Sequence, residues 1–162
     1  MLVINTNLNG WKMRAVIQRV DEANVTVKGI EVGAIARGLV VLLSIKEGDG
    51  DSDLDFLVRK ILNLRIFEDQ QGKMNASLRE VKGDLMVISQ FTLYGDCRKG
   101  SRPSYSRAAA PSEAESLYRK LIERIRLQKI NVECGQFGAM MKLNLVNDGP
   151  VTLIVDSGKE YC

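Results

Sequence analysis

Residues 39–45 read Leu-Val-Val-Leu-Leu-Ser-Ile, and this stretch decides the fold expected for the chain. Every residue except Ser44 is apolar, so both faces of a strand formed here would be buried, which is typical of a central strand in a sheet. Upstream, residues 13–20, 24–28 and 31–36 show shorter strand-like patterns, with glycines punctuating the segment. The sequence therefore predicts short strands in an antiparallel meander beside the central strand.

Downstream of this strand, the apolar spacing changes to that of a helix. Apolar residues recur three and four positions apart between 54 and 62, which indicates one buried helical stripe. Three aspartates stand at its N-terminal end, where the helix dipole favours negative charge. The segment resembles a calcium loop, but Leu54 and Lys60 occupy the positions where an EF-hand needs glycine and glutamate. Helix capping is therefore the better interpretation.

The remaining segments predict a mixed fold. A second helix is expected after Pro111, with a capping box formed by Ser112 and Glu115. The other expected elements are strands at 65–68, 84–90, 139–146 and 151–156, turns at 69–73 and 147–150, and a loop at 95–110. Together they predict an α/β fold: a single domain of mixed, largely antiparallel β-sheets with helices covering one face, in β/β/α layers.

Composition excludes several classes of function. The chain has 162 residues, of which 45% are hydrophobic and 27% charged, and it contains no histidine. This absence excludes Ser-His-Asp and Cys-His catalysis and histidine metal ligands. Cys97, Cys134 and Cys162 fit neither a disulfide framework nor a zinc ribbon, so they are expected to be thiols in a reducing cytosol. We predict no cofactor and no metal.

Two further expectations concern location and the start of the chain. No apolar run approaches the ~20 residues of a membrane span, so we expect a cytoplasmic protein with no membrane partner. Residues 1–12 are rich in asparagine and precede the first strand-like pattern. They are expected to be a poorly ordered extension, with the domain spanning residues 13–162.

Positive charge is concentrated in one part of the chain. Residues 98–129 contain nine basic and three acidic residues, although the whole chain has a net charge of only +3. A loop with four cations and Tyr105 leads into a basic helix, a pattern that suits contact with a phosphate backbone. A solvated helix face explains the same charges, and charge alone does not decide between them. The loop cations are Arg98, Lys99, Arg102 and Arg107.

Two short motifs carry the remaining chemical signal. Ser89-Gln-Phe-Thr-Leu93 follows a strand expected to be buried, and Gly149-Pro150 stands between two expected strands. The hydroxyls of Ser89 and Thr92 need an activating base to act as nucleophiles, and none lies within the motif. They can equally satisfy backbone groups, and the spacing of Gly149-Pro150 alone favours a simple turn.

Read together, the motifs resemble one family. Met13-Arg-Ala-Val-Ile-Gln-Arg-Val20, Ser89-Gln-Phe-Thr-Leu93 and Asn147-Asp-Gly-Pro-Val-Thr152 are similar to segments of the D-aminoacyl-tRNA deacylases of bacterial and eukaryotic type. The resemblance covers about residues 13–156. It implies a homodimer with active sites at the subunit interface, and hydrolysis of the ester between a D-amino acid and the terminal adenosine of tRNA.

The resemblance also implies roles for particular residues. Ser89, Gln90, Phe91 and Thr92 would line the site of one subunit, and a cis Gly149-Pro150 corner would reach in from the other. Its carbonyl groups would crowd an L-amino acid and accept from the amino group of a D-amino acid, while glycyl-tRNA(Ala) would pass the filter. Phe91 indicates the chirality-checking branch, because a related animal group has alanine there. The adenosine pocket would involve Ala114, Phe137 and Met141.

The implied mechanism needs no histidine. The 2′-hydroxyl of the terminal ribose would assist attack on the ester, and the protein would supply orientation and backbone donors. Thr92 acting as a nucleophile is the alternative within the family. Outside it, the competing interpretations are a non-catalytic RNA-binding domain, a structural or interaction protein, and a cysteine hydrolase.

Overall fold

One long bent strand organises the sheet in residues 12–159, the part of the chain that the computed structural model describes. Of the predicted extension, residues 1–12, all but Lys12 lies outside the described residues. The elements in chain order are β1 (Arg14–Val27), β2 (Ile30–Ile35), β3 (Gly38–Ser44), α1 (Asp51–Asn63), β4 (Phe67–Glu68), β5 (Met74–Ala76), β6 (Asp84–Ser89), the 3-10 helix η1 (Phe91–Tyr94), α2 (Pro111–Arg126), β7 (Val132–Cys134) and β8 (Met141–Asp156).

The central position predicted for residues 39–45 is confirmed. β3 lies between β1 and β6, antiparallel to the first and parallel to the second. Leu39, Leu43 and Val41 face the larger core, whereas Val40 belongs to a smaller core on the other face. Both faces of β3 are therefore buried, as its continuous apolar sequence requires.

The predicted meander is wrong in detail, because β1 lies between β2 and β3. The first half of β1 pairs with β3 and its second half pairs with β2. The expected separate strands at 13–20 and 24–28 form one strand. Its ladder with β8 shifts register on either side of Val20, so the break in the apolar pattern corresponds to bulges rather than to a turn.

The C-terminal strands are also continuous. β8 runs from Met141 to Asp156 and contains residues 147–150, which were expected to form a turn. Pairing with β1 on both sides of this corner keeps it extended, with the register shifts absorbing the bend. The strand expected at 65–68 is reduced to Phe67–Glu68, and β7 was not anticipated.

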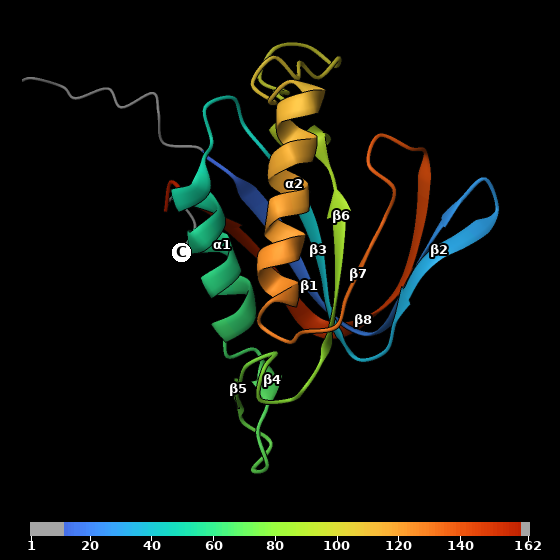
Figure 1. Ribbon diagram of the computed structural model, residues 1–162, viewed down its shortest axis with the longest axis vertical. Coiled ribbons are helices and arrows are strands. Elements are labelled where there is room, and N and C mark those ends of the chain that lie inside the picture. Colours follow the sequence, from blue (N-terminus) through green and yellow to red (C-terminus); the bar gives the residue numbers. More distant parts are fainter. Residues whose placement is uncertain (1–11, 160–162) are drawn as a thin grey trace, which may run out of the picture.

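Both helices cover one face of the sheet, as predicted (Figure 1). In α1, the Asp53 carboxylate accepts the Gly50 N–H at 2.9 Å, which confirms helix capping for the acidic segment. The capping box predicted in α2 is wrong, because the helix begins at Pro111 with Ala110 at the cap and no side-chain cap bond. Proline suits this first position, since its missing N–H would have no helical acceptor.

The two helices and the sheet enclose the larger core. Leu54 and Leu57 of α1, Leu121 and Ile125 of α2, and Leu85 of β6 are completely buried within it. Away from the helices, the second half of β1 curves off with β2 and part of β8 (Figure 1). Among residues 12–159, no helix is long and apolar enough to span a bilayer.

Candidate active site

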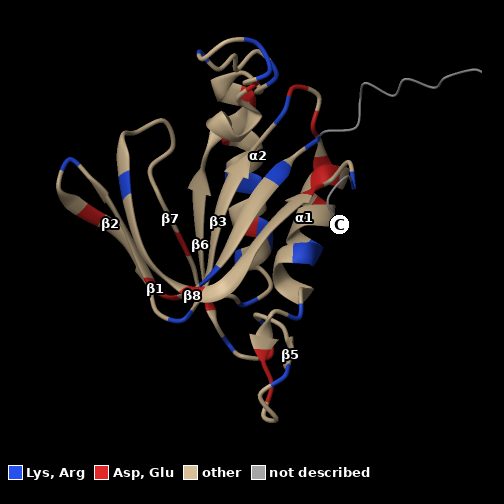
Figure 2. Cartoon of the chain, turned by 180° about the vertical axis from the view of Figure 1, so that it is seen from behind, with Lys and Arg blue, Asp and Glu red and all other residues tan. Residues whose placement is uncertain are grey.

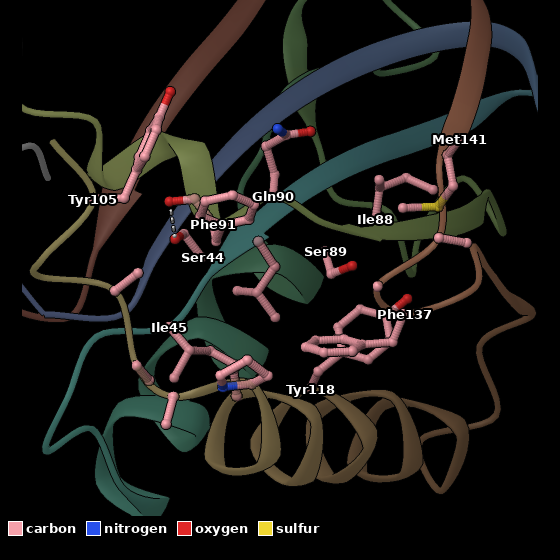
Figure 3. Close-up of a pocket in the computed structure, with 18 of the residues that line it drawn as sticks. Ser44, Ile45, Ile88, Ser89, Gln90, Phe91, Tyr105, Tyr118, Phe137 and Met141 are labelled. Carbon is pink, nitrogen blue, oxygen red and sulfur yellow. Dashed lines mark hydrogen bonds between the residues drawn. The ribbon is translucent and has the colours of Figure 1, made fainter. Parts of the chain in front are cut away.

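A pocket of about 710 Å³ opens between the end of β6, the start of α2 and residues 137–143. Six of the nine residues predicted to form the active site line it: Ser89, Gln90, Phe91, Ala114, Phe137 and Met141. Figure 3 labels all of them except Ala114. Segments distant in sequence thus meet at one pocket. The volume is within the ~300–1,000 Å³ range typical of small-molecule sites.

The S-Q-F-T segment forms a tight turn where β6 ends. The Gln90 N–H donates to the Leu43 carbonyl at 2.7 Å, which ties the turn to β3. The Ser44 hydroxyl donates to the Phe91 carbonyl at 3.4 Å. Chain reversal into η1 then leaves the Phe91 ring 58% exposed at the pocket. Ser89 and Gln90 face the same pocket because they immediately precede this reversal.

Thr92 does not line the pocket directly. Its hydroxyl accepts a hydrogen bond from the Gln90 amide at 2.5 Å. That bond makes Thr92 a partner that orients Gln90, and Gln90 faces the pocket. The structure therefore brings three of the four motif residues to the pocket and leaves the exposed Thr92 outside the lining, bonded to Gln90.

The opposite wall is aromatic and rests on α2. Tyr118 packs against Phe137 with ring centroids 5.7 Å apart, and its hydroxyl donates to the Val87 carbonyl of β6 at 2.8 Å. Burial raises the pKa of Tyr118 above its ordinary value, so the hydroxyl stays protonated. Gly135 makes room for Met141, because a Cβ at Gly135 would lie 2.3 Å from the Met141 sulfur.

The sequence analysis did not single out Tyr118 as a pocket residue, because it lies on the apolar stripe of α2. The spacing of a stripe cannot separate side chains that face a core from side chains that face a cavity. It also missed Ser44 and Ile45, which enter the pocket from the end of β3. Ser44 is the one polar residue of 39–45, but its position does not show that it faces a cavity, and Ile45 continues the apolar pattern of the strand.

The pocket lining is almost uncharged among the residues that the structure describes. Its described residues include two tyrosines and two serines, but no carboxylate, lysine, arginine or cysteine. Cys97 is exposed in the 95–110 loop and Cys134 is half-buried in β7, and neither contributes to the lining. Within residues 12–159, no cysteine is therefore placed to act as a nucleophile in this pocket. Within residues 12–159, no cluster of three or more metal-ligating side chains occurs.

The Gly149-Pro150 peptide is cis, and both residues are exposed. The buried Arg19 side chain holds the corner beside them, with Nε 2.8 Å from an Asp148 carboxylate oxygen. The same nitrogen donates to the Asp148 carbonyl at 3.2 Å. Neither Gly149 nor Pro150 lines the pocket of its own chain. Within one chain, the Gly149-Pro150 corner is therefore separate from the pocket that the S-Q-F-T motif lines.

The predicted phosphate-binding residues lie in the loop 95–110, beyond the N-terminal end of α2 (Figures 1 and 2). Asp96 binds Arg98 through two side-chain hydrogen bonds, which hold the pKa of Asp96 well below its usual range. Arg107 lies 4.0 Å from the same carboxylate. Lys99 and Arg102 have no ion-pair partner among residues 12–159.

A buried polar cluster supports η1 on the side away from the pocket. The Tyr94 hydroxyl donates to the Lys12 carbonyl, and the Arg14 guanidinium lies 5.6 Å from the centre of the Tyr94 ring. Asp49 accepts the Lys46 N–H at 2.7 Å, and burial raises the pKa of Asp49 to about 7. These contacts fix the base of the turn that presents the S-Q-F-T motif.

Comparison with known proteins identifies the family of this chain. A family model described as D-Tyr-tRNA(Tyr) deacylase matches residues 16–156. A D-aminoacyl-tRNA deacylase of Thermosipho melanesiensis is 58% identical over 92% of this chain and 100% of its own length. One from Syntrophobacter fumaroxidans is 54% identical with the same coverage. This chain therefore belongs to the D-aminoacyl-tRNA deacylase family, which is a family of hydrolases.

Solved structures agree in fold. A structure described as c-Myc DNA Unwinding Element Binding Protein superposes with a TM-score of 0.84 and 40% sequence identity, covering 89% of this chain and 98% of that chain. A probable eukaryotic D-amino acid tRNA deacylase superposes with a TM-score of 0.76 over 90% of this chain and 99% of its own. At 20% identity, the second likeness concerns the fold alone.

Proposed function

We propose that this protein hydrolyses the ester of D-aminoacyl-tRNA, releasing the D-amino acid and free tRNA. The observation that carries this proposal is the S-Q-F-T turn, in a chain that belongs to the deacylase family. The turn opens into a pocket whose described lining contains no carboxylate, lysine or cysteine. Such a pocket suits a reaction in which the substrate supplies the activating group. The protein contributes position and hydrogen bonds, which lower the barrier without proton transfer from a side chain.

In the proposed reaction, the 2′-hydroxyl of the terminal ribose assists a water molecule that attacks the ester carbonyl. The water oxygen forms a bond to the carbonyl carbon, and the bond from that carbon to the 3′-oxygen breaks. The attacking water loses one proton, and the 3′-oxygen gains one to become a hydroxyl. Gln90, oriented by Thr92, and the backbone donors of the turn hold the ester. Ala114, Phe137 and Met141 contact the adenosine, since they form the apolar side of the pocket.

Thr92 is then an orienting group and not the nucleophile. Thr92→Ala should keep substantial activity, whereas an acyl-enzyme mechanism predicts a loss of several orders of magnitude with folding intact. Thr26→Ala, in the distant half of β1, is the matched control for loss of a threonine hydroxyl. Single-turnover hydrolysis of D-Tyr-tRNA, with circular dichroism on each variant, separates the two mechanisms.

The chiral filter is proposed to come from a second copy of the chain. In the sheet register, Ser89 of β6 pairs with Leu43 at one end of β3. Asn147 of β8 pairs with Val20 of β1, and Val20 pairs with Gly38 at the other end of β3. Five residues along β3 span about 17 Å, and the three strand steps from β8 to β6 add about 14 Å sideways. The Gly149-Pro150 corner therefore lies roughly 20 Å from the Ser89 of its own chain.

This separation favours a homodimer in which each corner enters the partner's pocket. Val146 and Ile154, on β8 on either side of the corner, are 48% and 45% exposed, which leaves apolar surface for such an interface. The carbonyl groups of the corner would exclude the side chain of an L-amino acid and accept from the amino group of a D-amino acid. Glycine has no side chain to exclude, so glycyl-tRNA(Ala) is a proposed second substrate.

Release of tyrosine from D-Tyr-tRNA and L-Tyr-tRNA, measured side by side, tests the reaction and the filter. We expect rapid release from the D-ester with the L-ester spared. Release from neither would leave an RNA-binding relative without the activity. Release from both would retain the hydrolase and contradict the proposed filter.

Mixing two defective variants tests the shared site. Gln90→Ala damages the pocket, and Gly149→Val places a branched side chain on the corner. In a mixed dimer, one of the two sites has a native pocket and a native corner, so mixing should restore activity that neither variant has alone. Activity that stays at the mean of the two separate variants, despite exchange of subunits, would contradict a site built from two chains.

A further inference from the structure

Two aromatic rings remain exposed at one end of the pocket. Phe91 and Tyr105 are 58% and 39% exposed, and their rings meet edge to face with centroids 5.2 Å apart. Figure 3 shows this pair across the pocket from Phe137 and Tyr118. The pocket thus has two aromatic ends. The proposed function assigns adenosine to the end with Phe137 and leaves the end with Tyr105 without a ligand.

The loop holds Tyr105 in a defined position. A Cβ at Gly95 would lie 3.1 Å from Cε1 of Tyr105, so the ring occupies the space that a side chain at Gly95 would need. Main-chain hydrogen bonds join Asp96 and Ser104 in both directions, at 2.8 and 3.1 Å, and close the loop just before Tyr105. The ring is therefore presented by a braced loop that meets the pocket edge.

The charge around this pair suits a nucleic acid strand. The loop that carries Tyr105 also carries Arg98, Lys99, Arg102 and Arg107, with Asp96 as its single acidic residue between 95 and 110. Proteins that bind single-stranded nucleic acid combine such cations, which contact phosphates, with aromatic rings on which bases stack.

Two groups extend from an adenosine bound in the pocket. The aminoacyl ester carries an ammonium cation, and the 5′-phosphate leads to the preceding nucleotide, which in tRNA is a cytidine. A cationic loop repels the first group and attracts the second. The nucleotide, and not the amino acid, therefore fits the Tyr105 end of the pocket.

We propose that Phe91 and Tyr105 form a stacking subsite for the base that precedes the terminal adenosine, while the loop cations hold the phosphate between the two nucleotides. The inference rests on the proposed function, because it takes the adenosine to occupy the pocket. It extends recognition beyond the esterified nucleoside to the single-stranded end of the tRNA.

Three D-tyrosyl esters test this subsite: those of adenosine, of adenosine 5′-monophosphate and of the dinucleotide cytidylyl-adenosine. The ratio of kcat/KM between the dinucleotide and the mononucleotide reports the contribution of the added nucleotide. We expect about tenfold for the wild type, within the roughly 5- to 150-fold range of one base-aromatic stack. Tyr105→Ala should bring the ratio close to one, and Tyr105→Phe should retain it.

The dinucleotide-to-mononucleotide ratio of kcat/KM is measured on the same preparation of each variant. A difference between preparations in the fraction of active enzyme therefore cancels. A wild-type ratio of one, or an unchanged ratio in Tyr105→Ala, would overturn the subsite. If Tyr105→Ala slows D-tyrosyl esters of all three kinds equally but leaves D-alanyl esters unaffected, the rings serve the amino acid and the proposal is wrong. D-Tyr-tRNA is assayed in parallel, and its failure to react would instead overturn the proposed function.

Discussion

Replacing Gly38 by alanine tests the sheet that presents the S-Q-F-T turn. Gly38 pairs with Val20 of β1 on one side and with Asp84 of β6 on the other. A Cβ at Gly38 would lie 1.9 Å from the Asp84 carbonyl oxygen and 2.8 Å from the Asp84 nitrogen. These are main-chain atoms, so no side-chain rotation relieves the overlap.

The magnitude follows from the movement required. An ordinary contact begins near 3.4 Å, so β6 must move about 1.5 Å from β3 at this end. The Asp84 N–H now donates a hydrogen bond to the Arg37 carbonyl with a nitrogen–oxygen distance of 3.0 Å. The movement would lengthen this distance beyond hydrogen-bonding range. Overpacking costs about 1–3 kcal/mol and each lost bond about 0.5–1.5 kcal/mol. We expect Gly38→Ala to lower the free energy of unfolding by about 4 kcal/mol.

Urea unfolding followed by circular dichroism measures this loss. Gly50→Ala is the control, because a Cβ at Gly50 meets nothing within 4 Å and the backbone is extended there. The control should cost about 1 kcal/mol or less, as a changed helix cap. A loss below about 1 kcal/mol for Gly38→Ala, with an unchanged denaturant slope, would refute the close packing of β3 on β6.

Three other predictions address charge, the pocket wall and tRNA binding. The raised pKa of Asp49 means that the folded state binds a proton more tightly than the unfolded state, so stability falls as pH rises from about 4 to about 7. Urea unfolding at pH 5 and pH 8 should show this fall in the wild type and not in Asp49→Asn. Only the roughly two pH units between pH 5 and the folded pKa of about 7 contribute, which is at most about 2.7 kcal/mol. We expect about half of this, roughly 1.4 kcal/mol, because solvent screening reduces the effect. Tyr118→Phe removes a buried hydrogen bond to Val87 and should cost about 1 kcal/mol in the same assay; equal stability would mean that the bond contributes nothing. Arg102→Gln should weaken tRNA binding and reduce the slope of log affinity against log salt by about one without changing D/L selectivity; an unchanged salt slope would exclude Arg102 as a phosphate contact.

The parts of the fold that could be predicted are those in which side-chain pattern and burial coincide. Residues 39–45 are apolar on both faces, and the strand they form is buried on both faces. The acidic residues at the start of α1 were predicted to cap the helix because helix ends have unpaired N–H donors, and Asp53 makes that bond. In each case, local chemistry determines the structure.

Where distant pairing decides the structure, local signals gave the wrong answer. Asn147-Asp-Gly-Pro150 has the composition of a turn, yet it lies inside β8 because β1 pairs with the strand on both sides of it. Ser112 has the right spacing for a cap, but Pro111 already begins the helix. These outcomes depend on partners far away in the chain, which a local pattern does not contain.

The candidate site was predictable for a different reason. Its chemistry is carried by short motifs, so Ser89, Gln90 and Phe91 could be named before their neighbours were known. Their surroundings could not, because Tyr118 and Ser44 reach the pocket only through the packing of α2 and β3 around the end of β6. The same sheet register that gathers these residues carries the Gly149-Pro150 corner to the opposite end of the strands.

If chirality is checked by that corner, the fold makes the check depend on assembly. A monomeric variant of this chain should then retain its pocket and its affinity for adenosine while losing the distinction between D- and L-esters, and a monomer that still rejects L-Tyr-tRNA would show that the filter lies elsewhere.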